Sequence, residues 1–276
     1  MPLSFSLTTD LINSLTKLDN QFAEAFATLK NCTHEELDSL HKYARVGTIG
    51  ASTRIENALL TDIEVNWLDT ILTEHAKPTG FNQNRHLIEN KLSKDRERSI
   101  EEVAGCRAML LLIYSNPMDF VPLKENDLRA LHYELMSPYR KAIPYAGKYK
   151  TQSNSVIEYN KATKKSRTVF RTADPGVITS SAMHELIAWY NKTICMNPWH
   201  IATTSELVYR FLAIHPFQDG NGRLGRAMFL MSLLQSKSNI ISFVTKYVTI
   251  DRYIEKHKEE YYFVLNQCSD GYFKED

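Results

Sequence analysis

Apolar residues recur at helical spacing through most of this chain, and the clearest example lies near its start. There, large hydrophobic residues are separated by three or four positions: Leu11, Leu15, Leu18, Phe22, Phe26 and Leu29. This spacing places the side chains on one face of a long amphipathic helix. We expect that face to pack against the core.

Capping signals mark further helix starts. In a capping box, a Ser or Thr side chain and a Glu three positions later satisfy free backbone N–H groups at the start of a helix. The spacing occurs at three places before the middle of the chain: Thr33 with Glu36, Thr61 with Glu64, and Ser99 with Glu102. The fold is therefore predicted to be mainly α, with periodicity that indicates helices also over 100–114, 125–136 and 179–190.

One segment, 149–170, breaks the helical pattern. Residues with high β-propensity occupy 155–159 and 168–170, and a basic cluster lies between them: Lys161, Lys164, Lys165 and Arg167. This arrangement predicts a β-hairpin, and a run of like charges is typical of a solvated hairpin tip.

Composition excludes some classes of function. The chain has 276 residues, 43% of them hydrophobic and 24% charged, which is typical of a globular protein. Its net charge of +1 gives no electrostatic reason to expect nucleic acid or a membrane surface as partner. No apolar run approaches the roughly 20 residues that span a bilayer. The scattered cysteines predict reduced thiols and a cytoplasmic location: Cys32, Cys106, Cys195 and Cys268.

The turn between two predicted helices concentrates chemically active residues. Residues 214–226 read IHPFQDGNGRLGR, and the flanking apolar residues indicate that one helix ends near Ile214 and another begins near Gly222. Gly220 and Gly222 would let the backbone turn tightly and approach a ligand. The free N–H groups in the first turn of the second helix would then face an anion.

Charge supports the same interpretation. Arg223 and Arg226 lie three positions apart at a helix N-terminus, where the macrodipole repels cations, so a polyphosphate between them would relieve the conflict. His215, beside this turn, is a candidate base. Ordinary turn dipeptides followed by a solvated helix face are the simpler interpretation. Transition-metal binding by His215 and Asp219 is another, although no third His or Cys lies at ligand spacing.

These residues resemble the HPFxDGNGRxxR motif of Fic-domain proteins at every specified position. The resemblance implies a Fic-type helical bundle and transfer of AMP from ATP to a Ser, Thr or Tyr hydroxyl of another protein. It implies that His215 is the general base, that Asp219 holds Mg²⁺ against the phosphates, and that Phe217 anchors the loop in the core.

The same resemblance assigns the phosphate contacts. Asn221, with the backbone of Gly220 and Gly222, would form an anion hole for the phosphates. Arg223 would bind the β-phosphate, and Arg226 the γ-phosphate.

A second match lies upstream, at 51–57. The sequence ASTRIEN resembles the (S/T)xxxE(G/N) inhibitory motif of the family, with Ser52, Glu56 and Asn57 in the specified places. It is similar to the class whose inhibitory helix precedes the catalytic core. Glu56 would then pair with Arg226 and deny it to the γ-phosphate. Taken alone, so short a pattern also fits a capped surface helix.

The resemblance also implies a division of the chain and two further elements. Residues 1–98 would form an N-terminal helical region that carries the inhibitory helix, and 99–276 the catalytic core. The predicted hairpin would be the flap that clamps the target. Tyr261 would pack near the adenine, and Ser269 stands where some relatives have an asparagine that contacts adenine, so the base preference stays open.

The leading hypothesis is an auto-inhibited protein adenylyltransferase that uses ATP and Mg²⁺. The site is also compatible with removal of AMP from modified proteins, or with transfer of another phosphate-containing group. A nucleotide-sensing interaction protein without catalysis is the alternative from a different class. The expected partner is a protein with a hydroxyl side chain, self-modification included, and the resemblance allows a homodimer.

Overall fold

The computed structural model describes residues 3, 5–74, 77–89, 96–160 and 165–269. Its α-helices are α1 (Thr9–Leu29), α2 (His34–Ile55), α3 (Asp62–Ile71), α4 (Phe81–Glu89), α5 (Glu97–Ser115), α6 (Glu125–Met136), α7 (Val177–Met196), α8 (His200–Ile214), α9 (Asn221–Leu234), α10 (Asn239–Thr245), α11 (Ile250–Lys256) and α12 (Lys258–Ser269). Short strands β1 (Thr73–Glu74) and β2 (Lys77–Pro78) pair between α3 and α4. The predicted mainly α fold is confirmed.

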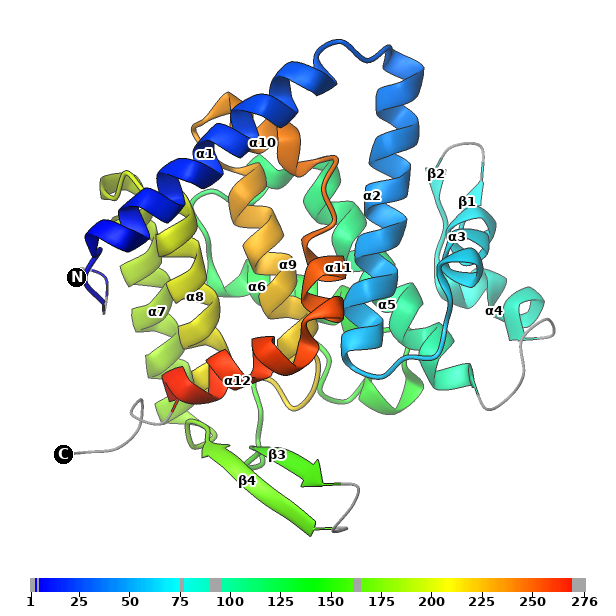
Figure 1. The fold of residues 1–276 in the computed structure, drawn as a ribbon. Helices are drawn as coiled ribbons and strands as arrows, with labels where there is room; N and C mark the ends of the chain where they lie inside the picture. Colours follow the sequence, from blue (N-terminus) through cyan, green and yellow to red (C-terminus); the bar gives the residue numbers. More distant parts are fainter. Residues whose placement is uncertain (1–2, 4, 75–76, 90–95, 161–164, 270–276) are drawn as a thin grey trace.

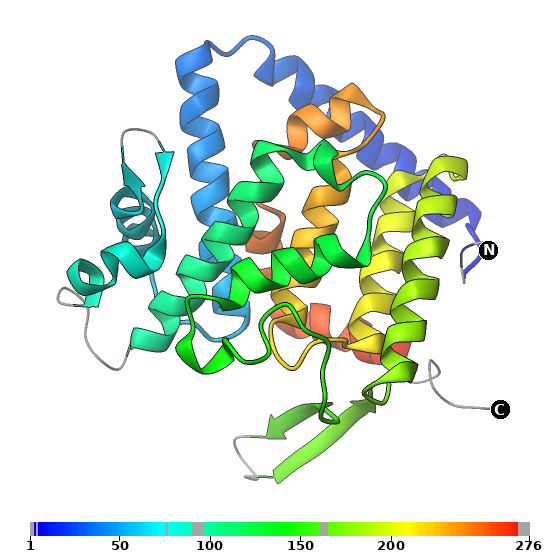
Figure 2. The same cartoon turned by 180° about the vertical axis from the view of Figure 1, so that it is seen from behind.

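Helix α9 lies at the centre of the bundle. Figures 1 and 2 show α8 on one side of it and α5 and α6 behind it, while α2 and α11 stand on the other side. Phe211 of α8 and Leu224 and Met228 of α9 are fully buried. Because Ile49 of α2 belongs to the same hydrophobic core, the N-terminal region packs directly on the helices that follow it. The predicted division at residue 98 stays a prediction.

The helix starts follow two of the three predicted capping boxes. Thr33 with Glu36, and Thr61 with Glu64, form reciprocal caps on α2 and α3. The third prediction is wrong, because α5 begins at Glu97 and its cap residue, Arg96, makes no capping bond with its side chain. Ser99 lies inside the helix, where its hydroxyl accepts a bond of 3.0 Å from the backbone N–H of Leu59.

The first helix packs less deeply than its apolar stripe suggests. Of the stripe, Leu15 alone is buried and the others are partly exposed. The helix lies along α10, where the rings of Phe26 and Phe243 meet edge to face with centroids 5.3 Å apart. The helix is confirmed, but the stripe borders the core.

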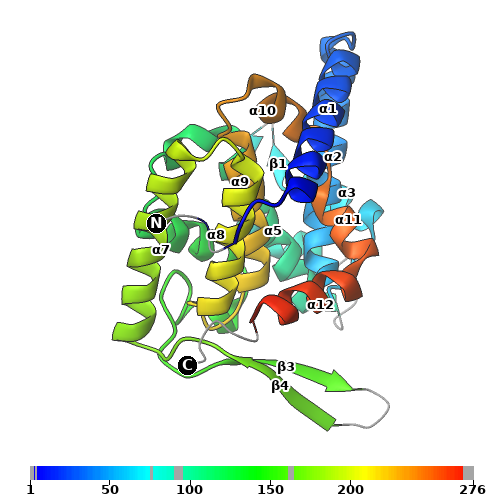
Figure 3. The same ribbon diagram turned by 60° about the vertical axis from the view of Figure 1, so that its left-hand side comes forward.

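The predicted hairpin consists of β3 (Ser155–Asn160) and β4 (Lys165–Arg171), paired antiparallel with a register shift between Val156 and Ile157. It projects from the bundle on the side where α12 lies (Figure 3). Lys161 and Lys164, part of the predicted basic tip, lie outside the described residues. No helix in the described ranges combines the length and apolar character needed to cross a membrane.

Candidate active site

The loop between α8 and α9 has the boundaries that its sequence predicts. Helix α8 ends at Ile214, and His215 caps it in the left-handed conformation, with φ of 52°. Gly220 also has positive φ, 81°, and precedes the first residue of α9. A non-glycine residue seldom adopts such a φ, so the contacts around the loop must hold His215 in place.

Two contacts anchor the loop in the core. Phe217 is fully buried, as predicted, and its ring stacks on that of His132 with centroids 3.8 Å apart. The side-chain amide of Asn221 accepts a bond of 3.0 Å from the N–H of Phe217 and donates one of 2.8 Å to its carbonyl. The side-chain amide of Asn221 thus braces the loop. Its predicted contact with phosphates stays a prediction.

His132 of α6 also contacts the loop, and no pattern in the sequence predicted this contact. Its Nδ1 accepts from the N–H of Gly147 at 2.9 Å, so Nε2 carries the proton and donates to the carbonyl of Asp219 at 2.9 Å. Burial lowers the pKa of His132 to about 4, against a weaker opposing effect of the Asp219 carbonyl. The ring is therefore neutral at physiological pH.

A strand-like segment, Tyr149 and Lys150, holds the other side of the loop. Tyr149 forms an isolated antiparallel bridge with Phe217, and the N–H of Lys150 donates to the carbonyl of Pro216 at 2.8 Å. The buried ammonium of Lys150 donates to the carbonyl of Ile214 at 3.2 Å, and burial lowers its pKa to about 8. Sequence reasoning missed this lysine too.

His215 faces a cavity of about 1660 Å³ that the loop shares with the ends of α2, α9 and α12. Its Nδ1 lies 3.2 Å from the carbonyl of Leu212, which fixes the proton on Nδ1 and leaves Nε2 as an acceptor. Burial, opposed by the bond to the Leu212 carbonyl and helped by Lys150, lowers the pKa of His215 to about 4. The imidazole is thus neutral and able to accept a proton.

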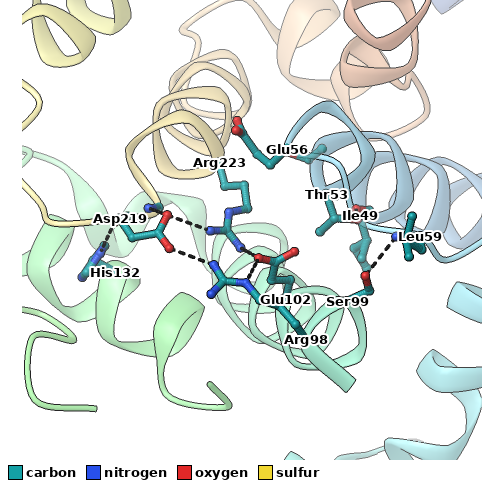
Figure 4. Close-up of polar contacts among 12 residues, drawn as sticks. Ile49, Thr53, Glu56, Leu59, Arg98, Ser99, Glu102, His132, Asp219 and Arg223 are labelled. Carbon is teal, nitrogen blue, oxygen red and sulfur yellow. Dashed lines mark hydrogen bonds and ion pairs between the residues drawn. The ribbon is translucent and has the colours of Figure 1, made fainter. Parts of the chain in front are cut away.

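Asp219 lies at one side of this cavity in a cluster of charges (Figure 4). Its carboxylate accepts from Arg98 at 3.0 Å, from Arg223 at 3.3 Å and from the N–H of Gly220 at 2.6 Å. Burial opposes its ionisation, but Arg223, the Gly220 N–H and Arg98 outweigh burial and lower its pKa. An ionised, partly exposed carboxylate of this kind suits Mg²⁺ shared with phosphates.

The described residues contain no group of three or more His, Cys, Asp or Glu side chains that could hold a metal by themselves. The transition-metal interpretation of His215 and Asp219 therefore gains no third ligand from this part of the chain. A metal bound at Asp219 would need further ligands from the substrate.

Arg223 is buried, with 3% of its side chain exposed, so the interpretation of a solvated helix face is wrong. Besides Asp219, it lies 3.9 Å from the carboxylate of Glu102 on α5. Glu102 also accepts a bond of 2.8 Å from Arg98. Arg98, which was not predicted, and Glu102, which was predicted only as part of a helix cap, therefore link the loop to α5.

Arg226 is equally buried and contacts α2, as predicted. Its Nη2 lies 2.9 Å from Oε1 of Glu56 and 2.8 Å from the carbonyl oxygen of Ser52, and its Nε lies 3.1 Å from the Ser52 hydroxyl. Glu56 also lies directly over Gly222, where a Cβ would meet its Oε1 at 2.3 Å. Gly222 has no positive φ, so it provides room for the carboxylate, and the tight turn belongs to Gly220.

The end of α2 explains the spacing of the upstream motif. Asn57 has φ of 73°, which Asn and Gly tolerate best, and its N–H bonds to the carbonyl of Arg54. The N–H of Ala58 reaches back to the carbonyl of Thr53 at 3.1 Å, which completes a Schellman motif. Arg226 thus meets the negative end of the α2 dipole.

The comparisons with known proteins agree with this geometry. Residues 122–233 match the model of the Fic/DOC family. This segment, which includes the loop from His215 to Arg226, is identified as a Fic domain.

Solved Fic-domain structures share the fold of this chain. A Fic-domain-containing signaling protein from Bacteroides thetaiotaomicron is 22% identical, with 90% of this chain and 80% of that one covered and a TM-score of 0.62. A Fic family protein from Desulfovibrio desulfuricans is 24% identical, with 97% and 69% covered and a TM-score of 0.67. Fic-1 from C. elegans is 16% identical, with 95% and 67% covered and a TM-score of 0.62. Fic-domain proteins are commonly transferases that use nucleotide substrates.

Two tyrosines of α12 complete the cavity that His215 faces. Tyr261, the predicted adenine neighbour, lines it together with Tyr262, which was not predicted. Burial raises the pKa of Tyr261, and Arg226 opposes that rise. Tyr261 thus lies close to the Arg226 end of the cavity, and its contact with adenine stays a prediction. The side chain of Ser269 lies outside the described residues.

Proposed function

We propose that this protein transfers AMP from ATP to a hydroxyl group on a protein side chain, and that Glu56 inhibits the transfer. The observation that carries the proposal is the convergence of His215, Asp219, Arg223 and Arg226 on one cavity, with Glu56 bonded to the last of them. A base, a carboxylate suited to Mg²⁺ and two buried cations are the groups that attack on a nucleotide phosphate requires.

The nucleophile would be activated by Nε2 of His215. The target hydroxyl gives its proton to this nitrogen while its oxygen forms a bond to the α-phosphorus, and the bond from the α-phosphorus to the bridging oxygen breaks to release pyrophosphate. The neutral form of the imidazole is ensured by its low pKa, about 4. An anionic nucleotide beside it raises that pKa and makes proton acceptance more favourable.

The phosphates would bind at the start of α9. The N–H groups of its first turn point out of the helix without partners inside it, and Arg223 lies beside them. Asp219 would hold Mg²⁺ together with the phosphates, and the ion would neutralise part of their charge. Arg226, at the end of the cavity nearest α2, would then bind the terminal phosphate.

Inhibition follows from the position of the Glu56 carboxylate. It is bonded to Arg226 and covers Gly222, so it occupies the space and the cation that a γ-phosphate would need. ATP would therefore bind weakly or with its phosphates out of line for attack. Movement of the α2 end, or loss of the Glu56 side chain, would open the site.

The hairpin β3–β4 would hold the target protein. A strand pair that projects beside the site can add an extended peptide through backbone hydrogen bonds. Recognition of this kind depends on the extended shape of the target more than on its side chains. The identity of the target is not readable from such a contact.

The test is incubation of wild type, Glu56→Gly and Glu56→Gly/His215→Ala with ATP labelled on its α-phosphate, alone and in a cell lysate. We expect strong labelling of the protein itself or of a partner by Glu56→Gly, weak labelling by wild type and none by the double variant. If Glu56→Gly binds ATP but labels no protein, the nucleotide-sensing alternative is favoured. Mass spectrometry of labelled proteins would identify the target.

A further inference from the structure

Arg226 has a second carboxylate partner that no motif in the sequence indicated. Oδ1 of Asp251, on α11, lies 3.1 Å from Nε of Arg226. Both side chains are buried, with 4% of each residue exposed. One cation is therefore shared between two carboxylates, Glu56 and Asp251, which approach it from different helices.

The two carboxylates occupy different edges of the guanidinium group. Glu56 bonds to Nη2, whereas Asp251 lies against Nε. Nη1 faces the phosphate loop, since a Cβ on Gly222 would lie 3.3 Å from it. Removal of Glu56 therefore leaves Asp251 in contact with Arg226 on the Nε edge, while Nη1 keeps its place beside the loop.

Asp251 does not line the cavity that His215 faces. It lines a second, largely apolar cavity of about 640 Å³ between α8, α9, α11 and α12, and Arg226 borders both cavities. A nucleotide in the first cavity would thus meet Arg226, with Asp251 behind it. Any influence of Asp251 on the nucleotide acts through the charge and orientation of Arg226.

Other contacts hold α11, the helix that carries Asp251, independently of Glu56. Its neighbours on α11 hold that helix to the N-terminal region, through an ion pair of Arg252 with Asp62 and a bond of 2.6 Å between Glu255 and Arg54. The Thr249 hydroxyl, at the start of α11, lies 3.4 Å from the carbonyl oxygen of Ala44. Replacement of Glu56 changes none of these partners.

We propose that Asp251 is a permanent counter-charge of Arg226 that limits how strongly the site selects nucleotides with a γ-phosphate, even after Glu56 withdraws. The inference rests on the proposed function, because it assigns the γ-phosphate to Arg226. Burial raises the pKa of Asp251, and Arg226 and the Ser52 hydroxyl oppose that rise. With Glu56 in place and both carboxylates ionised, the cation and its two carboxylates carry a net charge of −1. Without Glu56, the terminal phosphate meets a neutral pair, so part of the attraction of Arg226 is already cancelled.

The test compares the binding of ATP and AMP, each with Mg²⁺, by isothermal titration calorimetry. The two proteins are Glu56→Gly and Glu56→Gly/Asp251→Asn, because asparagine keeps the size of the side chain and removes its charge. We expect the double variant to bind ATP roughly fivefold to tenfold more tightly, on the scale of one charge interaction in a partly screened site. AMP lacks the β- and γ-phosphates, so its Kd should change by less than about twofold. Equal or weaker binding of ATP would overturn the proposal and make Asp251 a residue that only orients Arg226.

A matched control uses Arg226→Ala. In Glu56→Gly/Arg226→Ala, the additional change Asp251→Asn should leave the Kd of ATP unaltered. If ATP still binds more tightly, the carboxylate acts directly on the nucleotide, and its proposed action through Arg226 is wrong.

A second measurement applies if Glu56→Gly/Asp251→Asn does not fold, because the double variant buries a cation with no counter-charge. The single variant Asp251→Asn keeps the pair of Arg226 with Glu56. ATP should raise its Tm more than it raises that of wild type, and AMP should raise both equally. No difference in the effect of ATP contradicts the proposal. Neither test depends on AMP transfer, so absence of labelling by Glu56→Gly would defeat the proposed function without deciding the role of Asp251.

Discussion

Arg223 and Arg226 are the same residue type three positions apart on α9, and both are buried, yet their surroundings differ. Arg223 pairs with Asp219 and Glu102, which belong to the loop and to α5. Arg226 pairs with Glu56 and Asp251, of which the first caps the end of the N-terminal helix α2. The partners of Arg223 come from the loop and from the core helix α5, so in the proposed function this cation is held in place for a substrate. One partner of Arg226 comes from the end of α2, so in the proposed function this cation can be switched.

The largest expected difference between the two arginines is in stability. Arg226→Ala leaves the buried Asp251 without a cation, and loss of one partner of a buried pair typically costs about 3–5 kcal/mol. Arg223→Ala leaves Asp219 with Arg98 and the Gly220 N–H, so we expect about 1–2 kcal/mol. Urea unfolding followed by circular dichroism would measure both. Equal losses would remove the distinction drawn between the two sites.

The next effect concerns activity. Glu56→Gly should raise AMP transfer about 100-fold, which corresponds to about 2.7 kcal/mol of inhibition by one charge-assisted contact. Glu102 serves as the matched control because its carboxylate lies beside the other arginine. Glu102→Gln should not activate, since Glu102 supports the loop. Activation by both variants would mean that any loss of negative charge near α9 opens the site.

The residues of this comparison that were predictable from the sequence belong to short motifs, each confined to a few neighbouring positions. The loop from His215 to Arg226 and the pair of Ser52 with Glu56 were predicted because each motif is local and the resemblance linked them. The α9 boundaries followed from apolar spacing and glycine. These patterns can be recognised in the sequence because the residues of each lie on one turn or one helix.

The supporting residues were not predictable in the same way. Arg98 reaches Asp219 across 121 positions and His132 across 87, and neither lies in a motif of its own. Asp251 resembles any acidic residue in the first turn of a short helix. The spacing of Ser99 and Glu102 was misleading, because α5 begins before Ser99. The Ser99 hydroxyl accepts from Leu59, and Glu102 accepts from Arg98 of the same helix. Contacts of this kind depend on how helices pack.

The third prediction concerns pH and belongs to the loop side of the comparison. Burial lowers the pKa values of His132 and His215 to about 4, from the usual 6.5. Between these values the unfolded chain binds protons that the folded protein excludes, so stability is full above about pH 6.5 and falls as the pH approaches 4. We expect each histidine to cost about 1–2 kcal/mol between pH 7 and pH 5.

Unfolding in urea at several pH values would measure this slope, and His132→Gln should reduce it by about half. Imidazole resonances of His132 or His215 that titrate near pH 6.5 in the folded protein would contradict the prediction. On the switch side of the comparison Arg226 keeps its charge across the range, whereas burial raises the pKa of Asp251, so that carboxylate opposes the slope.

The smallest effect should come from the contact that holds α2 against α11. Arg54 pairs with Glu255 at 2.6 Å and with Asp62 at 2.9 Å, in a partly exposed position. Exposed and partly exposed ion pairs stabilise proteins by about 1 kcal/mol or less, so Arg54→Ala should cost no more than that in urea unfolding. Because Arg54 lies two residues before Glu56, a loosened α2 end should still raise basal AMP transfer by a few fold. Activity that rises with salt in wild type but not in Arg54→Ala would support this, since salt screens the same pair. Unchanged basal activity in Arg54→Ala would show that the Schellman motif and Ser52 alone hold Glu56 on Arg226.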